Sequence, residues 1–166
     1  MHAAEQLSVE KASTGDADEI ATLYLASRAD ALPYLRRVHT DNEVHTWIRN
    51  VVLTQGETWV ARLRGSIVGF VALVGYDVDQ LYVLPGYYRC GVGRKLLDLA
   101  KARSPGRLLL YTFQRNGRAR AFYESQGCRI IDMTDGLRNE EKEPDIRYEW
   151  TPIATPRTSK VPPGQK

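Results

Sequence analysis

Seven stretches of the chain have the apolar pattern typical of β-strands, either alternating apolar and polar residues or a short apolar run. They cover residues 7–12, 57–64, 66–74, 77–84, 107–112, 128–133 and 146–150. Gly65 separates the second stretch from the third, so this pair predicts a β-hairpin. Pro85-Gly86 follows the fourth stretch and is expected to end it. The run at 107–112 (RLLLYT) predicts a buried strand.

In four other stretches, apolar residues recur every three or four positions, as on one face of a helix. These helices are expected from Thr14 or Asp16 to residue 28, and over residues 40–53, 91–102 and 116–126. Residues 29–39 are predicted to form a loop, because Pro33 disfavours the helical conformation in the residue before it. The second helix opens with Thr40-Asp-Asn-Glu43, which matches a capping box.

The order of these elements indicates a mixed central β-sheet flanked by helices, which is an α/β or α+β fold. We expect one domain at residues 1–151, and the sequence contains no internal repeat. Residues 152–166 are rich in Pro, Thr and Gly and contain three basic residues but no acid. This segment is therefore predicted to be a disordered basic tail.

Charge and composition narrow the classes of function. The formal net charge of +3 comes from the tail, because the rest of the chain has equal numbers of basic and acidic residues. This argues against nucleic-acid binding. No apolar run approaches the roughly 18 residues of a membrane span. Cys90 and Cys128 are too few for a disulfide framework and lack metal-ligand spacing. Without a recognisable signal peptide at the start, the cytoplasm is the expected compartment.

The stretch Gly86–Leu97 (GYYRCGVGRKLL) combines two glycines with several basic residues at the expected start of a helix. A helix N-terminus has unpaired N–H groups and the positive end of the helix dipole. Gly91 and Gly93 carry no Cβ, so an anion could approach these N–H groups closely. The stretch fits neither the dinucleotide fingerprint nor the P-loop. It therefore indicates another kind of phosphate-binding loop, although Gly-x-Gly alone is also compatible with a tight turn.

This stretch and the strand before it resemble the acetyl-CoA-binding motif of the GCN5-related N-acetyltransferase (GNAT) superfamily. In that motif, Gln/Arg-x-x-Gly-x-Gly/Ala follows a strand that ends in Val-x-Pro. The small positions and the strand end are matched by Gly91, Gly93, Val83 and Pro85. Tyr88 stands in the Gln/Arg position, where it departs from the motif, and the adjacent Arg89 could supply the charge.

A second motif strengthens the resemblance. Asn116–Cys128 (NGRARAFYESQGC) is similar to the family signature Asn-x-x-Ala-x-x-Phe-Tyr-x-x-x-Gly-Phe, with Cys128 in place of the final aromatic residue. The two motifs occur in the family's order and separation. Together with the order of the elements, the resemblance covers residues 7–151.

The resemblance implies an acetyl-CoA-dependent N-acetyltransferase that needs no metal. The fourth strand would pair through its backbone with the pantetheine arm, the glycine loop would bind the diphosphate, and Asn116 would orient the ligand. The implied cofactor-binding residues are Leu81, Tyr82, Val83, Tyr88, Arg89, Cys90, Gly91, Val92, Gly93, Arg94 and Asn116.

Acetyl transfer to an amine needs a base for the amine, whereas the leaving thiolate needs only modest help from an acid. Tyr123 is the expected acid, because in the resembling enzymes this residue faces the thioester sulfur. From periodicity alone, the same residue would be assigned to the core. Asp79, four residues before Val83, is the leading candidate for a base that acts through water. A strand-start carboxylate facing solvent is the other interpretation of Asp79, and further candidates for the base are His39, His45 and Glu57.

The acceptor pocket is expected to be formed by the first two helices and their loop, with Tyr34, His39 and Trp47 as substrate-binding candidates. The first hypothesis for the acceptor is a small-molecule amine. Alternatives are a peptide or protein amine, which would need an open groove, and a non-catalytic acyl-CoA-binding regulator. The acidic segment 134–150, which in relatives often lines the acceptor site or a dimer interface, is expected to be mostly solvated. A homodimer is left open.

Overall fold

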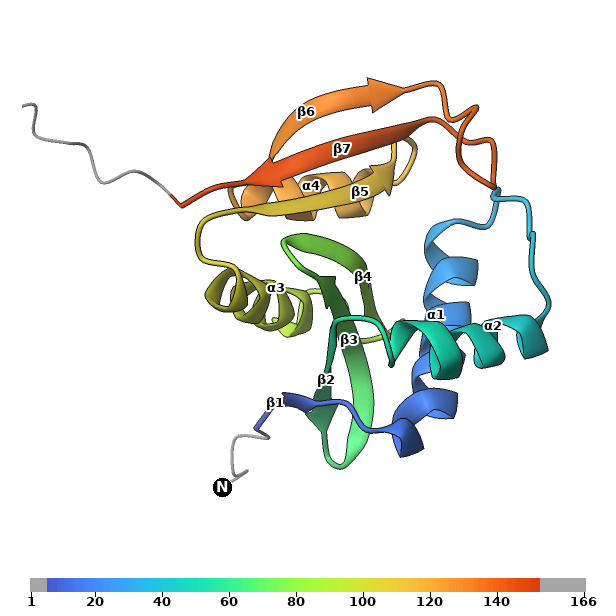
Figure 1. The fold of residues 1–166 in the computed structure, drawn as a ribbon, viewed down its shortest axis with the longest axis vertical. Helices are drawn as coiled ribbons and strands as arrows, with labels where there is room; N and C mark the ends of the chain where they lie inside the picture. The colour runs from blue at the N-terminus through green and yellow to red at the C-terminus, as the bar shows by residue number, and fades with distance from the viewer. Residues whose placement is uncertain (1–5, 153–166) are drawn as a thin grey trace, which may run out of the picture.

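The computed structural model describes residues 6–152 and contains a mixed sheet of seven strands (Figure 1). The strands are β1 (Ser8–Lys11), β2 (Glu57–Leu63), β3 (Ser66–Val74), β4 (Asp77–Val83), β5 (Leu108–Phe113), β6 (Arg129–Thr134) and β7 (Asp145–Trp150). Their order across the sheet is β1-β2-β3-β4-β5-β7-β6. All neighbours are antiparallel except β4 and β5, which are parallel. This architecture confirms the predicted fold class.

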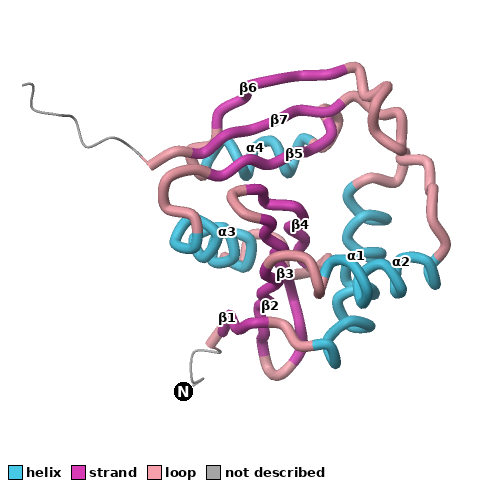
Figure 2. Tube along the Cα trace, in the orientation of Figure 1, coloured by secondary structure: helices cyan, strands magenta, loops and turns pink. Residues whose placement is uncertain are grey.

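The helices cover both faces of this sheet (Figures 1 and 2). They are η1 (Thr14–Asp16), α1 (Ala17–Ala31), α2 (Asp41–Trp47), η2 (Ile48–Val52), α3 (Val92–Arg103) and α4 (Gly117–Ser125). Phe70 and Ala72 of β3 pack in one core with α1 and α2. The alternate residues Val71 and Leu73 pack in a second core with α3 and with Tyr123 of α4. Both faces of β3 are therefore buried, which explains its continuous apolar run.

The first helix is longer than predicted. Residues 29–31 belong to α1, whereas we expected a loop from residue 29. Pro33 restricts only the residue before it, and Leu32 (φ −133°, ψ 54°) is where the helix ends. The predicted start is confirmed, because Asp16 is the N-cap of α1. The short turn η1 precedes it, capped by Ser13, which forms a capping box with Asp16.

The second predicted helix is divided into two parts. α2 begins after Thr40, whose side chain accepts a hydrogen bond from the backbone of Glu43, as the sequence indicated. It ends at Trp47 and continues as the π-helical turn η2, in which the N–H of Leu53 bonds to the carbonyl of Ile48 at 3.0 Å. Such turns are rare and have no simple periodic signature.

The strand expected at 107–112 is buried over only half its length. Leu108, Leu109 and Leu110 are buried, but the side chain of Tyr111 is 57% exposed. The exposed half begins where pairing between β4 and β5 stops.

The structure tests little of the predicted division into a domain at residues 1–151 and a tail at residues 152–166. The boundary expected at residue 151 lies just after β7 and stays a prediction, and residues 153–166 of the expected tail lie outside the described part. Within residues 6–152, no helix has both the length and the apolar character needed to cross a membrane. The same residues contain no cluster of three or more potential metal ligands.

Candidate active site

A cavity of about 720 Å³ lies where β4 and β5 separate. The two strands pair only at Asp77–Leu109 and Val78–Leu110. At this point β4 contains one extra residue, Asp79, because Leu73 of β3 pairs with Val78 and Ala72 pairs with Gln80. A bulge of this kind bends a strand and interrupts its pairing. The cavity therefore results from a local feature of β4.

The β4 side of the cavity is formed by Leu81, Tyr82 and Val83, three of the residues predicted to bind the cofactor. These residues pair with β3 but not with β5. Their second backbone edge is consequently unpaired toward the cavity. An extended ligand with amide groups could bond to this edge as an additional strand would.

The end of the cavity near α3 has the features of an anion site. Gly91 precedes α3 with φ +83°, a left-handed conformation that favours glycine. Gly91 and Gly93 line the cavity together with Arg89 and Arg94. Lys95 instead donates a hydrogen bond to the carbonyl of Leu7, so its ammonium group is engaged away from the cavity lining.

Two residues of the predicted loop do not line the cavity. Val92 is 2% exposed and packs in the core beneath α3, and Cys90 is exposed outside the lining residues. Gly93 has a second role, because a Cβ at this position would lie 3.2 Å from Cζ of Phe122. The first turn of α3 therefore packs closely against α4.

Asn116 lies at the start of α4 and lines the cavity. Its side-chain oxygen accepts a hydrogen bond from the N–H of Ala119 at 3.2 Å, so it is the N-cap of the helix. This contact leaves the amide NH₂ group to donate to a ligand. The family signature and the capping requirement thus select the same residue.

Tyr123 lines the cavity from α4 and is 7% exposed. Its ring packs against Phe122 and against Tyr148, with ring centroids 5.4 and 5.8 Å away. Burial raises the pKa of the Tyr123 phenol above its usual value near 10, because the phenolate would be poorly solvated. The hydroxyl is therefore protonated at neutral pH and can act as a proton donor.

Asp79, the extra residue of β4, is exposed and lines the same cavity as Tyr123. Its carboxylate accepts one long hydrogen bond from Nε2 of Gln80, at 3.4 Å. The bulge thus places an exposed carboxylate at the edge of the cavity.

The three expected acceptor residues do not line this cavity. Trp47 packs edge-on against Tyr24, which in turn packs against Tyr82 of β4. The ring of Tyr34 lies 3.7 Å from the guanidinium carbon of Arg115. Trp47 is thus linked to the cavity wall through two aromatic rings. Tyr34 and His39 contact residues that lie outside the cavity lining.

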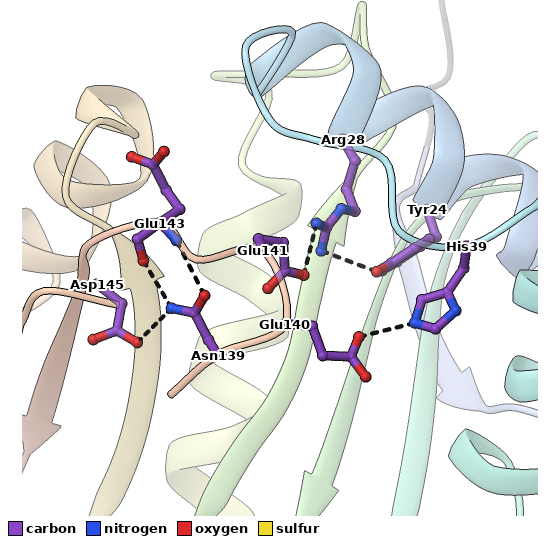
Figure 3. Close-up of polar contacts among 8 residues, drawn as sticks. All are labelled: Tyr24, Arg28, His39, Asn139, Glu140, Glu141, Glu143 and Asp145. Carbon is purple, nitrogen blue, oxygen red and sulfur yellow. Dashed lines mark hydrogen bonds and ion pairs between the residues drawn. The ribbon is translucent and has the colours of Figure 1, made fainter. Parts of the chain in front are cut away.

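The acidic segment between β6 and β7 is less solvated than the sequence indicated, although Asp135 and Glu140 remain exposed. Glu141 accepts a hydrogen bond from Arg28 at 3.2 Å, and Glu140 lies 2.8 Å from Nε2 of His39 (Figure 3). Glu143, which is 8% exposed, pairs with Arg115. These contacts join the β6–β7 loop to α1 and to the α1–α2 segment. We expected the acids to be solvated, and no local pattern reveals partners so distant in the sequence.

His39 gives this junction a pH dependence. Hydrogen bonds to Glu140 and to Glu43 raise the pKa of His39 above 6.5. Protonated His39 therefore stabilises the folded state below about pH 6.5, and this contribution is lost as the pH rises through the raised value. We expect the free energy of unfolding to fall slightly between pH 6 and 8.5, and His39→Gln to flatten this change in urea titrations.

The control for this prediction is Arg49→Gln. Arg49 contacts Asp18 on another part of the surface and does not titrate in this pH range, so this variant keeps the His39–Glu140 contact. It should retain the pH dependence of the wild type. An equal slope in the wild type and in His39→Gln would contradict the prediction.

Comparison with known proteins identifies relatives of this chain. Residues 54–129 match the family described as Acetyltransferase (GNAT) domain. The chain is 26% identical over 148 residues to the peptidyl-lysine N-acetyltransferase YiaC of Escherichia coli K12, covering 89% of this chain and 99% of that protein. Apo YjaB from Escherichia coli has a similar solved structure, with a TM-score of 0.73 and 23% sequence identity. The match covers 87% of this chain and 97% of YjaB. A PaiA N-acetyltransferase from Thermoplasma acidophilum, solved in complex with coenzyme A, is also similar, with a TM-score of 0.68 and 18% sequence identity. This match covers 88% of this chain and 99% of the PaiA chain.

Proposed function

The chain belongs to the GNAT superfamily of acetyl-CoA-dependent N-acetyltransferases, and from this premise we propose that it acetylates the primary amine of a small molecule. The observation that carries the proposal is the cavity between β4 and β5. It combines an unpaired strand edge, a helix N-terminus flanked by arginines and a buried phenol. No single one of these features would suffice, but together they match the parts of a CoA thioester and its reacting sulfur.

The residues of the cavity fit acetyl-CoA, which supplies the acetyl group as a thioester. The backbone of residues 81–83 would pair with the amides of the pantetheine arm, and Asn116 would donate to the same arm. The first turn of α3, from Gly91 to Arg94, would bind the diphosphate through backbone N–H groups and arginine side chains.

Two proton transfers accompany the reaction. An alkylamine with a pKa of about 10.4 is neutral in roughly one molecule in 2,500 at pH 7, which corresponds to about 4.6 kcal/mol. Asp79 would accept the amine proton through a water molecule. As the C–N bond forms and the C–S bond breaks, Tyr123 would donate its proton to the leaving sulfur. The nitrogen loses its second proton to solvent after the attack, and Tyr123 regains its own proton from solvent. The products are an amide and free CoA thiol.

The acceptor side favours a compact amine. The β6–β7 loop contacts α1 through Glu141 and Arg28, and the α1–α2 segment through Glu140 and His39 (Figure 3). We assign the acceptor side to these segments, and a groove for an extended peptide would then have to pass between them. Their contacts support a small acceptor.

A second candidate acceptor is the side chain of a peptide lysine. It is favoured by the relatives YiaC and YjaB, which are both named as peptidyl-lysine N-acetyltransferases. Binding of a peptide in a groove at this position would require the loop contacts to open.

The test is release of CoA thiol from acetyl-CoA with matched acceptors. Lysine amide carrying an N-α-acetyl group and the same lysine within a peptide of about ten residues present the same amine and differ in bulk. We expect a higher kcat/KM with the smaller acceptor, and a loss of about tenfold in Asp79→Asn with both. A higher value with the peptide would support the second candidate. No thiol release above hydrolysis with these acceptors or a panel of free amines would overturn the proposed function.

A further inference from the structure

An arginine that neither motif assigns to the cofactor lies at the anion end of the cavity. Arg118 lines the cavity from the first turn of α4. Phe122, four residues later, contacts Gly93 in the first turn of α3. Residues four apart lie on the same face of a helix, separated by about 6 Å along its axis. Arg118 is therefore one helical turn from the point where α4 meets α3.

The ring of Tyr88 holds Arg118 beside the glycine loop. The guanidinium carbon lies 4.2 Å from the ring centroid of Tyr88, which also lines the cavity three residues before Gly91. Tyr88 occupies the position at which the GNAT motif has Gln or Arg, so this loop lacks that polar side chain. Stacking on an aromatic ring uses the face of the guanidinium and leaves the N–H donors in its plane available.

One anion already lies at this edge of the guanidinium. Oδ2 of Asp30, from α1, is 3.3 Å from Nη1 of Arg118. The Arg118 and Asp30 side chains are 56% and 46% exposed, and such exposed pairs are weak. A phosphate oxygen offers the same interaction in a charge-assisted and often bidentate form. Asp30 thus marks a place at which a phosphate could bind instead.

The charges that line the cavity agree with this assignment. Among the described residues, its charged lining consists of Arg89, Arg94 and Arg118, with Asp79 as the single carboxylate. Asp79 belongs to the β4 bulge, whereas the arginines lie on the glycine loop, on α3 and on α4. A ligand with phosphates at one end and an amine-reactive group at the other would be oriented by this separation.

We infer that Arg118 binds the diphosphate of the acyl donor and releases Asp30 when it does so. In this way α4 supplies the positive charge that the glycine loop lacks at position 88. This inference rests on the proposed use of a CoA donor. It predicts opposite effects for the two partners of the ion pair. Arg118→Gln removes a phosphate-binding group, and Asp30→Asn removes the group that competes for it.

Calorimetric titration with CoA, dephospho-CoA and pantetheine tests the inference without an acceptor. Dephospho-CoA keeps the diphosphate but lacks the 3′-phosphate, and pantetheine carries no phosphate. We expect Arg118→Gln to bind CoA and dephospho-CoA about tenfold more weakly and pantetheine unchanged. Asp30→Asn should bind both nucleotides severalfold more tightly, and the double variant should behave like Arg118→Gln.

The control is Arg49→Gln, because Arg49 pairs with Asp18 and does not line the cavity. It should bind all three ligands like the wild type. An equal loss of pantetheine affinity in Arg118→Gln would indicate a structural role, and a loss for CoA but not dephospho-CoA would indicate the 3′-phosphate. Either result, or no change, overturns the inference while the proposed function stands. Failure of the wild type to bind CoA would overturn both.

Discussion

Tyr123→Phe is expected to lower kcat for acetyl transfer by about 10²–10³ while KM for acetyl-CoA changes little, because the variant removes only the proton donor. The phenol ring packs between Phe122 and Tyr148, and phenylalanine preserves these contacts. The fold and the donor cavity should therefore remain intact. Steady-state kinetics, with circular dichroism and CoA binding as checks on the fold, would measure the effect.

Tyr148→Phe is the matched control for this prediction. Tyr148 is fully buried, its ring lies 5.8 Å from that of Tyr123, and its hydroxyl is buried without a hydrogen-bond partner. It does not line the cavity, so its hydroxyl should be dispensable for catalysis. Equal losses in both variants would show that the aromatic cluster, and not proton donation by Tyr123, supports activity.

The pH profile gives an independent check on the acid. Burial raises the pKa of Tyr123, so the phenol stays protonated throughout the neutral and moderately alkaline range. Deprotonation of the acceptor amine should therefore make kcat/KM rise with pH, with no decline from loss of the acid below about pH 10. A decline centred near pH 8 in the wild type that disappears in Tyr123→Phe would contradict this assignment.

Local patterns predicted most of the fold. The hairpin of β2 and β3 could be read from alternation around Gly65, and the start of α2 from Thr40 and Glu43. Each of these signals depends on residues close together in the sequence. The extension of α1 to Ala31 and the π-helical turn η2 could not be read in the same way. Packing on the sheet decides whether such marginal segments continue as helix.

The candidate site likewise has parts that short local patterns predict and parts that they do not. The end of the cavity that we propose to bind the diphosphate is lined by residues of the contiguous stretch from Tyr88 to Arg94 and by Asn116 at the start of α4, so two short motifs were sufficient to predict most of this lining. The bulge that places Asp79 is visible only in the register between β3 and β4. A one-dimensional pattern carries no information on that register once both faces of a strand are apolar.

The junction between the β6–β7 loop, α1 and the α1–α2 segment depends on pairs that the sequence separates widely. Arg28 and Glu141 are 113 residues apart, and His39 and Glu140 are 101 apart. Each side chain by itself has the character of a surface residue. Only the arrangement of α1 beside the β6–β7 loop turns them into a junction, which is why the acidic segment was expected to be solvated.

Gly91→Trp is expected to weaken acetyl-CoA binding by at least about 100-fold. No atom lies within 4 Å of a Cβ at this position, so the side chain would project into open space at the cavity lining. It would stand where the diphosphate must approach the first N–H groups of α3. The positive φ of +83° also strains a tryptophan backbone, by about 1–2 kcal/mol.

Gly75→Trp is the control that separates the effect of backbone strain from the effect of blocking the cavity. Gly75 also has a positive φ, of +60°, and open space around its Cβ, but it lies in the β3–β4 turn and does not line the cavity. Both variants should lose similar stability in thermal unfolding, and only Gly91→Trp should lose acetyl-CoA affinity in calorimetry. Wild-type affinity in a folded Gly91→Trp protein would place the diphosphate elsewhere. Because Arg118 and the glycine loop would then no longer share a ligand, that result would also remove the basis for assigning Arg118 to it.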